Sequence, residues 1–356
     1  MSKPSGVESL VSKLNVLIKG SRIPLETTAD LLSVTVSEEL DLPAMFTLQL
    51  ANWNLVKNQI TWSDSELFDI GNLVEIQMGY GNNITTLIVA EITGLEPEFS
   101  QRATPTLGVR GHDLRHRLLR GCNTRSFTQM KDSDIFRKIA GDRGISCQTK
   151  DTRIKLEYVL QANQTDLEFL QQRARRIGYE VAVEGKTLHF RSHQNHTQKV
   201  LTLNRSDDLI EFSPRLSTMS QVGQVEVHLW DVKQKKALVG KAGAGDETTT
   251  MKGSTSGPQN TNLAFGKASH VIINEPVLSQ AEAEQIAKGQ YNDMALAYIT
   301  GEGTCQGNPN LRAGHTIEMT GLGKRFSGLY YLTSVTHLYS EKLGYRTEFS
   351  VRRNAA

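Results

Sequence analysis

Hydrophobic residues alternate with polar residues along the N-terminal part of the chain. In segment 13–19, Leu14, Val16 and Ile18 alternate with polar neighbours, and this period of two is typical of a half-buried strand. The same pattern recurs in segments 32–36, 46–50, 73–80, 85–95 and 106–110, with a turn at residues 80–83. Regularly spaced turns between short strands are typical of antiparallel barrels and sandwiches. Residues 1–110 are therefore predicted to form a first β-barrel region, with a loose arm or short helix over residues 1–12.

The period changes in the middle of the chain. Ile135, Phe136, Ile139 and Ala140 fall on one helical face, and Asp132 or Ser133 can cap that helix. A second helix is predicted from the capping box Thr165-x-x-Glu168, with Gly178 at its end. Segments 179–183 and 187–191 then read as a hairpin. Together they predict a small α+β insertion, assigned to residues 111–200.

The C-terminal part returns to strands. Strands are predicted at 209–212, 222–231, 295–304, 315–321, 329–338 and 346–352. Between them, residues 240–262 are rich in Gly, Ser, Thr and Lys, which predicts a mobile loop, and Ser279-x-x-Glu282 predicts a helix over 279–291. We assign residues 201–352 to a second β-barrel region.

Two segments of the β regions resemble each other. Residues 71–76 and 314–319 share the pattern G-x-x-[VI]-E-[IM]. Residues 91–95 align with residues 334–338, and both segments contain [IV]-T-x-L. Chance is the alternative, because short β motifs recur easily. A duplication predicts two similar barrels, so that three copies of the chain would present six similar units around one axis.

Composition and charge narrow the function. The formal net charge is +2, from 40 basic and 38 acidic residues, which argues against a dedicated nucleic-acid-binding protein. The three cysteines, Cys122, Cys147 and Cys305, have no C-x-x-C spacing and are interpreted as buried free thiols. The N-terminal segment lacks an apolar signal-peptide core, and no apolar run is long enough to span a membrane. We expect synthesis in the cytoplasm without a signal peptide.

Candidate chemical motifs are incomplete. His112-Asp113-Leu114-Arg115-His116 resembles the zinc motif H-E-x-x-H, but it follows a strand and has Asp in place of Glu. His193 and His196 are expected to be exposed to solvent, and residues 240–246 lack the Gly-Lys-Ser/Thr ending of a phosphate-binding loop. No G-x-S-x-G elbow or acid/base pair of carboxylates stands out. We therefore assign no catalytic, cofactor-binding or metal-binding residue and expect no enzyme and no cofactor.

Six arginines lie in one short segment, in which Asp113 is the nearby acid: Arg102, Arg110, Arg115, Arg117, Arg120 and Arg125. They could form an electropositive surface for nucleic acid or an acidic partner. The preferred interpretation is a salt-bridged face at a subunit contact, because interleaved aromatic residues and a basic domain charge are absent.

An ordered set of motifs over residues 15–352 resembles the phage late control protein D family, which includes the hub part of VgrG proteins. The motifs are Phe68-x-x-Gly71-x-x-Val74 to Tyr80, Val109-Arg110-Gly111-His112-Asp113, Tyr158 to Leu170 with Arg176-x-Gly178-Tyr179, Asn310 to Ile317, Phe326 to Leu332, Val335-Thr336-His337 and Tyr345 to Phe349. The resemblance implies a trimeric hub ring that docks the inner tube on one side and the spike on the other.

This resemblance leads to a functional hypothesis. We expect a structural baseplate hub of a contractile phage-tail-like injection system, a homotrimer that adapts a sixfold inner tube to a threefold spike. The chain carries no β-helix repeat after the hub part, so we expect either a separate OB-fold or β-helical spike protein as a partner or a spike domain that this sequence does not include. Other baseplate components are further expected partners, whereas nucleic acid is not. The alternatives are a tail-associated hydrolase and a nucleic-acid-binding β-barrel protein.

Overall fold

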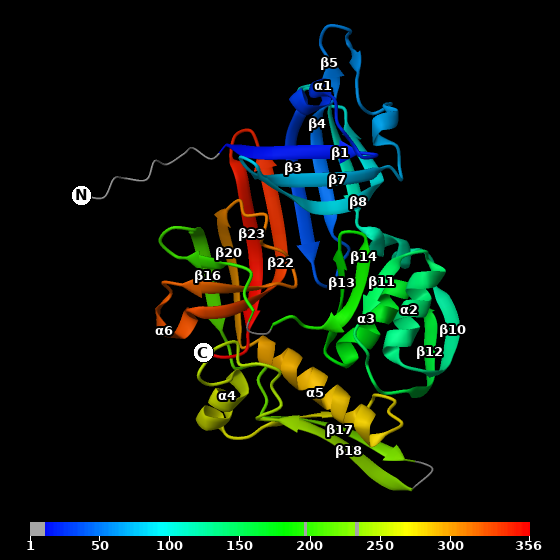
Figure 1. Ribbon diagram of the computed structural model, residues 1–356, viewed down its shortest axis with the longest axis vertical. Coiled ribbons are helices and arrows are strands. Elements are labelled where there is room, and N and C mark those ends of the chain that lie inside the picture. Colours follow the sequence, from blue (N-terminus) through cyan, green and yellow to red (C-terminus); the bar gives the residue numbers. More distant parts are fainter. Residues whose placement is uncertain (1–10, 196–197, 232–234) are drawn as a thin grey trace, which may run out of the picture.

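The computed structural model describes residues 11–195, 198–231 and 235–356, and the chain is mainly β. Figure 1 shows a first β region at the top, a second β region below it on the left, a mixed insertion on the right and a small α/β layer at the bottom. Within the described residues, no helix is both long and apolar enough to cross a membrane. The predicted mainly β fold with an α+β part is therefore confirmed.

One large sheet runs through both β regions, in the order β16-β20-β23-β22-β3-β4-β9-β8-β7-β1-β2. The first region contributes β1 (Ser12–Ile18), β2 (Ser21–Arg22), β3 (Leu31–Glu39), β4 (Met45–Ala51), β7 (Leu73–Tyr80), β8 (Asn83–Glu98) and β9 (Thr106–His112). The second contributes β15 (Thr202–Asn204), β16 (Leu209–Leu216), β20 (Ile299–Gln306), β21 (Thr316–Thr320), β22 (Gly328–Ser340) and β23 (Gly344–Arg353). Strand β15 pairs with β21, which pairs with β22. The two β regions are thus joined where β22 pairs with β3.

Alternation places one face of each strand in a core. In β3 and β4, Val34, Val36, Phe46 and Leu48 are fully buried, whereas the residues between them are partly exposed. These side chains belong to the core of the first region, and a separate core under β20–β23 includes Ile299, among others. Because a one-residue slip would turn every apolar side chain outward, these cores fix the register.

The same strand order occurs twice in the sheet. The first region has the order β3-β4-β9-β8-β7, and the second has β16-β20-β23-β22-β21. Strands in the same position of the two sets correspond, for example β3 to β16 and β8 to β22, and the chain passes through the positions of each set in the same sequence. Two of the register irregularities match as well. The β3–β4 register shifts between Leu31 and Ser33, and the β16–β20 register shifts between Leu209 and Glu211.

A second pair of bulges extends this match. The β8–β9 register shifts between Ile92 and Gly94, and the β22–β23 register shifts between Leu332 and Ser334. Bulges are built features of a sheet rather than defects, so two coincident bulges are a strong mark of equivalence.

The G-x-x-[VI]-E-[IM] segments occupy equivalent places. Gly71 and Gly314 both have positive φ, and their amides donate to the carbonyls of Ile92 and Leu332 at 2.8 Å. The second part of the sequence echo is wrong in register. Ile92 corresponds to Leu332 and not to Val335, because the two hairpins differ in length.

The insertion has a core of its own, drawn from residues between Leu118 and Phe190. Its elements are the 3₁₀ helix η2 (Leu114–Leu119), β10 (Asn123–Met130), α2 (Asp132–Asp142), β11 (Ser146–Thr149), β12 (Leu156–Gln164), α3 (Asp166–Arg176), β13 (Tyr179–Glu184) and β14 (Thr187–Ser192). The capping box of Thr165 and Glu168 and the β13–β14 hairpin are confirmed. The predicted cap of α2 is wrong, because Lys131 is the N-cap and the Asp134 carboxylate accepts from its amide.

The bottom layer corrects two predictions. It consists of β17 (Gln224–Asp231), β18 (Lys236–Gly243), α4 (Gly257–Phe265), β19 (Ser269–Ile272) and α5 (Gln280–Leu296). Segment 240–262 is not one loop, because its first residues pair with β17 and its last residues form α4, which Ser256 caps. Helix α5 starts after Ser279 as predicted but continues past residue 291, where Tyr291 and Leu296 pack as buried side chains.

Short elements complete the chain: α1 (Leu25–Ala29), β5 (Trp53–Asn54), β6 (Gln59–Ile60), η1 (Glu66–Phe68) and α6 (Gly323–Phe326). The predicted arm lies largely outside the described residues, and its last residue, Ser12, already belongs to β1. The mobility of segment 240–262 and the domain boundaries stay predictions.

Candidate functional site

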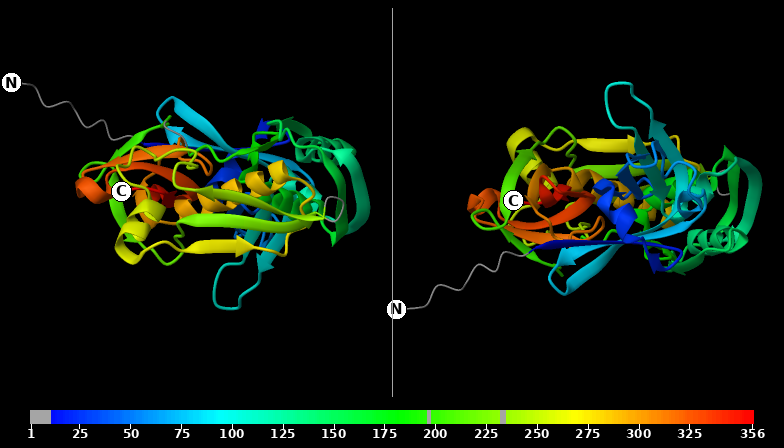
Figure 2. Two further views of the ribbon diagram at one scale, coloured as in Figure 1. Left: turned by 90° about the horizontal axis from the view of Figure 1, so that it is seen from below. Right: turned by 90° about the horizontal axis from the view of Figure 1, so that it is seen from above.

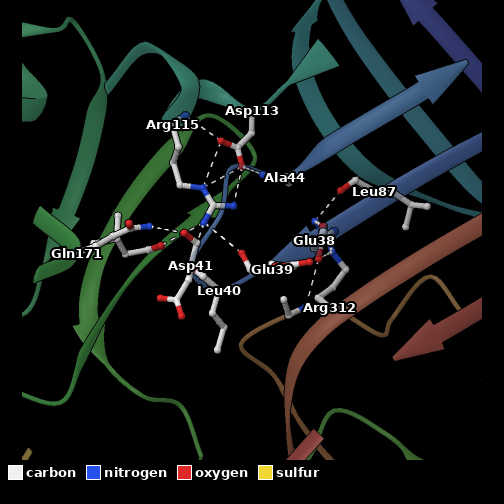
Figure 3. A network of polar contacts seen from close by, with 12 residues as sticks. Glu38, Glu39, Leu40, Asp41, Ala44, Leu87, Asp113, Arg115, Gln171 and Arg312 are labelled. Atoms are coloured by element: carbon white, nitrogen blue, oxygen red, sulfur yellow. Dashed lines mark hydrogen bonds and ion pairs between the residues drawn. The ribbon is translucent and has the colours of Figure 1, made fainter. Parts of the chain in front are cut away.

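Asp113 and Arg115 form a buried ion pair where the first β region meets the insertion (Figure 3). Strand β9 ends at His112, and Asp113 then caps η2 by accepting the Arg115 amide at 2.8 Å. The other carboxylate oxygen accepts from the Ala44 amide at 2.8 Å and from the Arg115 guanidinium at 2.8 Å. Only 3% of the Asp113 side chain and 4% of the Arg115 side chain are exposed.

The Arg115 guanidinium also holds the insertion. It donates to the carbonyls of Glu39 and Leu40 at the end of β3, and to the carbonyl of Val181 in β13, each at 3.3 Å. A buried charge is costly unless it is paired and hydrogen-bonded, and Arg115 meets both conditions. Gln171 adds a hydrogen bond from α3 to the Asp41 carbonyl at 2.7 Å (Figure 3).

Arg312 joins the second β region to the first in the same way. Its Nε donates to both oxygens of Glu38 at 2.8 and 3.0 Å, and its terminal nitrogens donate to the carbonyls of Thr86 and Leu87 in β8. Glu38 also accepts from the Ala313 amide at 3.2 Å. A cavity of about 130 Å³ lies between the two ion pairs, bordered by all three regions. The arrangement is suited to holding three regions in one orientation.

A second buried cluster ties the insertion to β22. The Glu180 carboxylate, in β13, accepts from Arg191 at 3.0 Å, from His193 at 3.2 Å and from the Tyr331 hydroxyl. Burial alone would raise the pKa of Glu180, but the hydrogen bonds from His193, Tyr331 and Arg191 lower it. Burial and the neighbouring Glu180 raise the pKa of Tyr331 well above its ordinary value. This cluster therefore keeps a charged carboxylate and a neutral phenol at the contact.

A third cluster links the insertion to the bottom layer. Arg176, at the end of α3, binds the carboxylates of Glu275 at 2.8 Å and Glu282 at 2.7 Å. Beside it, Gly178 and Gly289 bring the end of α3 and helix α5 so close that an added Cβ on Gly178 would lie 3.0 Å from the Gly289 Cα. In all three clusters the charged side chains bond across contacts between regions, which fixes the orientation of these regions relative to one another.

The histidines of the zinc-like motif are engaged elsewhere. His112 Nδ1 lies 2.7 Å from the Thr93 hydroxyl, and His116 Nε2 lies 2.8 Å from the Glu91 carboxylate. The segment between them is a 3₁₀ turn that begins with buried Asp113, so the two imidazoles do not share one helical face. Within the part of the chain that the structure describes, no group of three or more His, Cys, Asp or Glu side chains could hold a metal ion.

Two other expectations about single residues are wrong. His193 is not an exposed histidine, because it lies against Glu180 and the Tyr331 ring, whereas His196 lies outside the described residues. Of the three thiols, only Cys305 is buried, and Cys122 is exposed. The segment that resembles a phosphate-binding loop lies partly in β18, and the Asp246 carboxylate accepts from the Gly243 amide.

The arginine segment is largely ion-paired, with acids that are distant in sequence. Arg110 pairs with Glu96, Arg117 with Glu91, and Arg125 with Asp166. With Arg115, four of the six arginines are thus neutralised. Arg102 and Arg120 make no ion pair with the described residues. The salt-bridged interpretation is supported, while its assignment to a subunit contact stays a prediction.

Sequence reasoning missed the Arg312–Glu38 and Glu180 clusters. The two partners of the first pair lie in different β regions, and those of the second lie in the insertion and in β22. Asn310 to Ile317 stands out in the family resemblance, but nothing in its local pattern names Glu38 as the partner.

The model of one protein family, described as the Alg8 N-terminal domain, matches residues 8–341. The chain belongs to the Alg8 N-terminal domain family. This description differs from the late control protein D family that the sequence motifs suggest, so the predicted family name is not confirmed. A comparison with curated proteins finds no match.

Several solved structures share the fold of this family member over nearly its whole length. The 43 kDa tail protein of prophage MuSo2 from Shewanella oneidensis is similar at a TM-score of 0.71 and 13% identity, covering 96% of this chain and 98% of that one. A tail protein of Neisseria meningitidis MC58 is similar at a TM-score of 0.68 and 15% identity, covering 96% of this chain and 97% of that one. A third structure is a type VI secretion system component of E. coli, which is described as structurally similar to T4 bacteriophage tail proteins. Its TM-score is 0.62 at 14% identity, and the match covers 96% of this chain and 77% of that one. At these identities, the likeness shows a common fold.

Proposed function

We propose that this chain is a structural hub of a contractile phage-tail-like injection system. Three copies would form a ring that adapts a sixfold inner tube to a threefold spike. The observation that carries the proposal is the doubled strand order, because three chains with two equivalent β units each offer six units around one axis. The shared fold with two tail proteins and a type VI secretion component supports the same role.

The two units would act as tube-like barrels once the ring closes. In the single chain, the pairings form one path that ends at β16 on one side and at β2 on the other. Exposed strand edges favour pairing with another chain, and a closed ring removes them. The ion pairs at the junctions support a structural role, because they fix the orientation of the two β units, the insertion and the bottom layer.

The proposed hub role implies several partners. We propose that one end of the ring binds the inner tube and that the other end binds a separate spike protein with an OB-fold or β-helix. Other baseplate components would contact the outside, and the assembled tail or particle would be the place where the protein acts. The insertion projects to one side of both β regions, which suits such a peripheral contact (Figure 1).

Light scattering of the purified protein tests the proposal directly. We expect a molar mass three times that of the 39.5 kDa chain. Electron microscopy of the protein mixed with its tube protein should show a threefold ring stacked on a sixfold disc. A protein that stays monomeric, alone and with the tube protein, would contradict the hub function.

A further inference from the structure

The joint between the two β regions provides a template for a contact between copies. Within the chain, residues 334–340 of β22 pair antiparallel with residues 33–39 of β3, for example Thr336 with Ser37 and Tyr339 with Val34. In the doubled strand order, β22 corresponds to β8 and β3 corresponds to β16. The matching bulges fix this correspondence residue by residue, so Ser334 corresponds to Gly94 and Ser33 to Glu211.

The corresponding strand edges are open in the single chain. Strand β8 pairs with β7 through residues 83–91 only, so residues 94–98 have no strand partner on that side within the described residues. Strand β16 pairs with β20 alone and forms the edge of the sheet. In both end views, the connection between β8 and β9, in cyan to teal, stands away from the rest of the chain (Figure 2).

We propose that β8 of one copy pairs with β16 of the next copy in the register that β22 and β3 use within the chain. This inference rests on the proposed hub function and gives its subunit contact. The register places Leu95 opposite Leu216, Glu96 opposite Arg215 and Glu98 opposite Ser213 of the neighbouring copy.

The two edges are chemically complementary on the core side. The side chains that would meet there are all apolar, namely Leu95 and Pro97 from β8, Phe99 directly after it, and Phe212, Pro214 and Leu216 from β16. In the single chain none of the six is buried, and 64% of Phe99 is exposed. At the equivalent place within the chain, Val335 and His337 meet Val36 and Glu38, all of them buried. A second copy would therefore cover apolar surface that is open in the single chain.

The outward side is complementary in charge. Arg215 lies on β16 without an ion pair to the described residues, and the register places it opposite Glu96, which pairs with Arg110 in its own chain. Glu98 and Ser100 would face Ser213 and Glu211, so no two like charges meet directly. Pro97 falls opposite Pro214, and since neither residue has an amide proton, the ladder has no hydrogen bond at that one pair.

Because β8 and β16 are different edges, the contact is head-to-tail. Such contacts close into rings when the rotation is right, and otherwise produce open filaments. The single chain already contains one contact of this kind, between its own two β regions, at the β22–β3 joint. Three copies would then alternate three internal joints with three contacts between copies.

Disulfide trapping tests the register. Glu98→Cys and Ser213→Cys are combined in a C122S background, since Cys122 is the exposed native thiol. The Cα atoms of directly opposed strand residues lie about 4.5–5.5 Å apart, within the Cα–Cα range of a disulfide, whereas those of diagonal neighbours lie about 7–8 Å apart. The matched control combines Glu98→Cys with Glu211→Cys, which lies on the same face of β16 two positions away.

Under mild oxidation, the 98/213 pair should give covalent dimers and trimers on a non-reducing gel, several-fold more than the 98/211 pair. Light scattering on the same samples separates the two proposals. A trimer in which the 98/213 pair does not link, or in which the 98/211 pair links better, would overturn the register and leave the hub function standing. A monomer would contradict the hub function itself, and an open filament would overturn the closed ring.

Discussion

The two β regions have the same strand order but different residues where each strand pair meets its neighbour. At the β22–β3 joint, the core side carries His337 and Glu38, whose polar groups bond to Leu311, Tyr345 and Arg312. At the equivalent open edges, the positions of His337 and Glu38 hold Pro97 and Leu216. Within one chain, buried polar groups can form hydrogen bonds with partners that fold with them. At an edge that a second copy would cover, apolar side chains avoid the cost of burying polar groups without hydrogen-bond partners.

The cores also differ in where the aromatic rings lie. In the first region, Phe46 is fully buried and its ring lies over Gly111, where an added Cβ would come within 2.2 Å of it. In the second, the ring over Gly301 belongs to Phe212 of the edge strand β16, and this side chain is only partly buried. The ring of Phe46 is thus enclosed in the single chain, while the edge of the second core at Phe212 stays partly open to solvent.

Truncation of these two rings should give the largest difference between the regions. Phe46→Ala should lower the free energy of unfolding by about 4 kcal/mol, because it leaves a cavity in a fully packed core. The change Phe212→Ala should cost about 1–2 kcal/mol in the monomer, because that ring is partly solvated. Urea unfolding followed by circular dichroism at low protein concentration measures both. Equal losses would show that the second core is as closed as the first.

The joint between the regions should be the next most sensitive place. Arg312→Met should lower the free energy of unfolding by about 2–3 kcal/mol, because it leaves the largely buried Glu38 without its guanidinium. Arg346→Met, on the exposed face of β23, is the control and should change stability by less than about 0.5 kcal/mol. If both variants behaved alike in thermal unfolding, Arg312 would not be holding the two regions together.

Alternation predicted most strands of both regions, and β7 extends over the predicted residues 73–80. It missed β15, and the first residues of the predicted strand 295–304 belong to the end of α5. It was insufficient for the register, because the echo between residues 92 and 335 depends on hairpin length, which the pattern does not contain. The end of α5 was missed because Tyr291 and Leu296 pack against other elements rather than continuing a simple stripe. The ion pairs between the regions could not be predicted from the sequence for a related reason. Glu38 and Arg312 become neighbours only after β3 and β22 pair.

Acid should destabilise the joint through His337. Burial and the nearby Arg312 lower the pKa of His337 from 6.5 to about 3, although its bond to the Leu311 carbonyl acts in the opposite direction. Below pH 6.5 the unfolded chain binds a proton at this position that the folded chain does not, so stability falls as the pH falls toward 3. The loss due to His337 should be about 2 kcal/mol between pH 6.5 and pH 5.

Unfolding of His337→Gln at several pH values isolates this contribution. Glutamine can still donate to the Leu311 carbonyl and accept from Tyr345, but it does not titrate. The variant should therefore show a smaller loss of stability between pH 6.5 and pH 5 than the parent chain, whereas His270→Gln, on the exposed strand β19, should keep the parent slope. An unchanged slope in His337→Gln would mean that other groups carry the acid sensitivity.

The smallest expected effect concerns the proposed contact between copies. Arg215→Glu would place a carboxylate opposite Glu96 of the neighbouring copy and should weaken association by about 0.6 kcal/mol, or roughly threefold, per contact. Glu96→Arg combined with Arg215→Glu reverses the pair and should restore association, and added salt should reduce the difference because both groups are exposed. Analytical ultracentrifugation at low ionic strength measures the effect. Since Arg215 makes no ion pair in its own chain within the described residues, monomer stability should not change. If Arg215→Glu associates as the parent chain does, β16 meets its neighbour in another register.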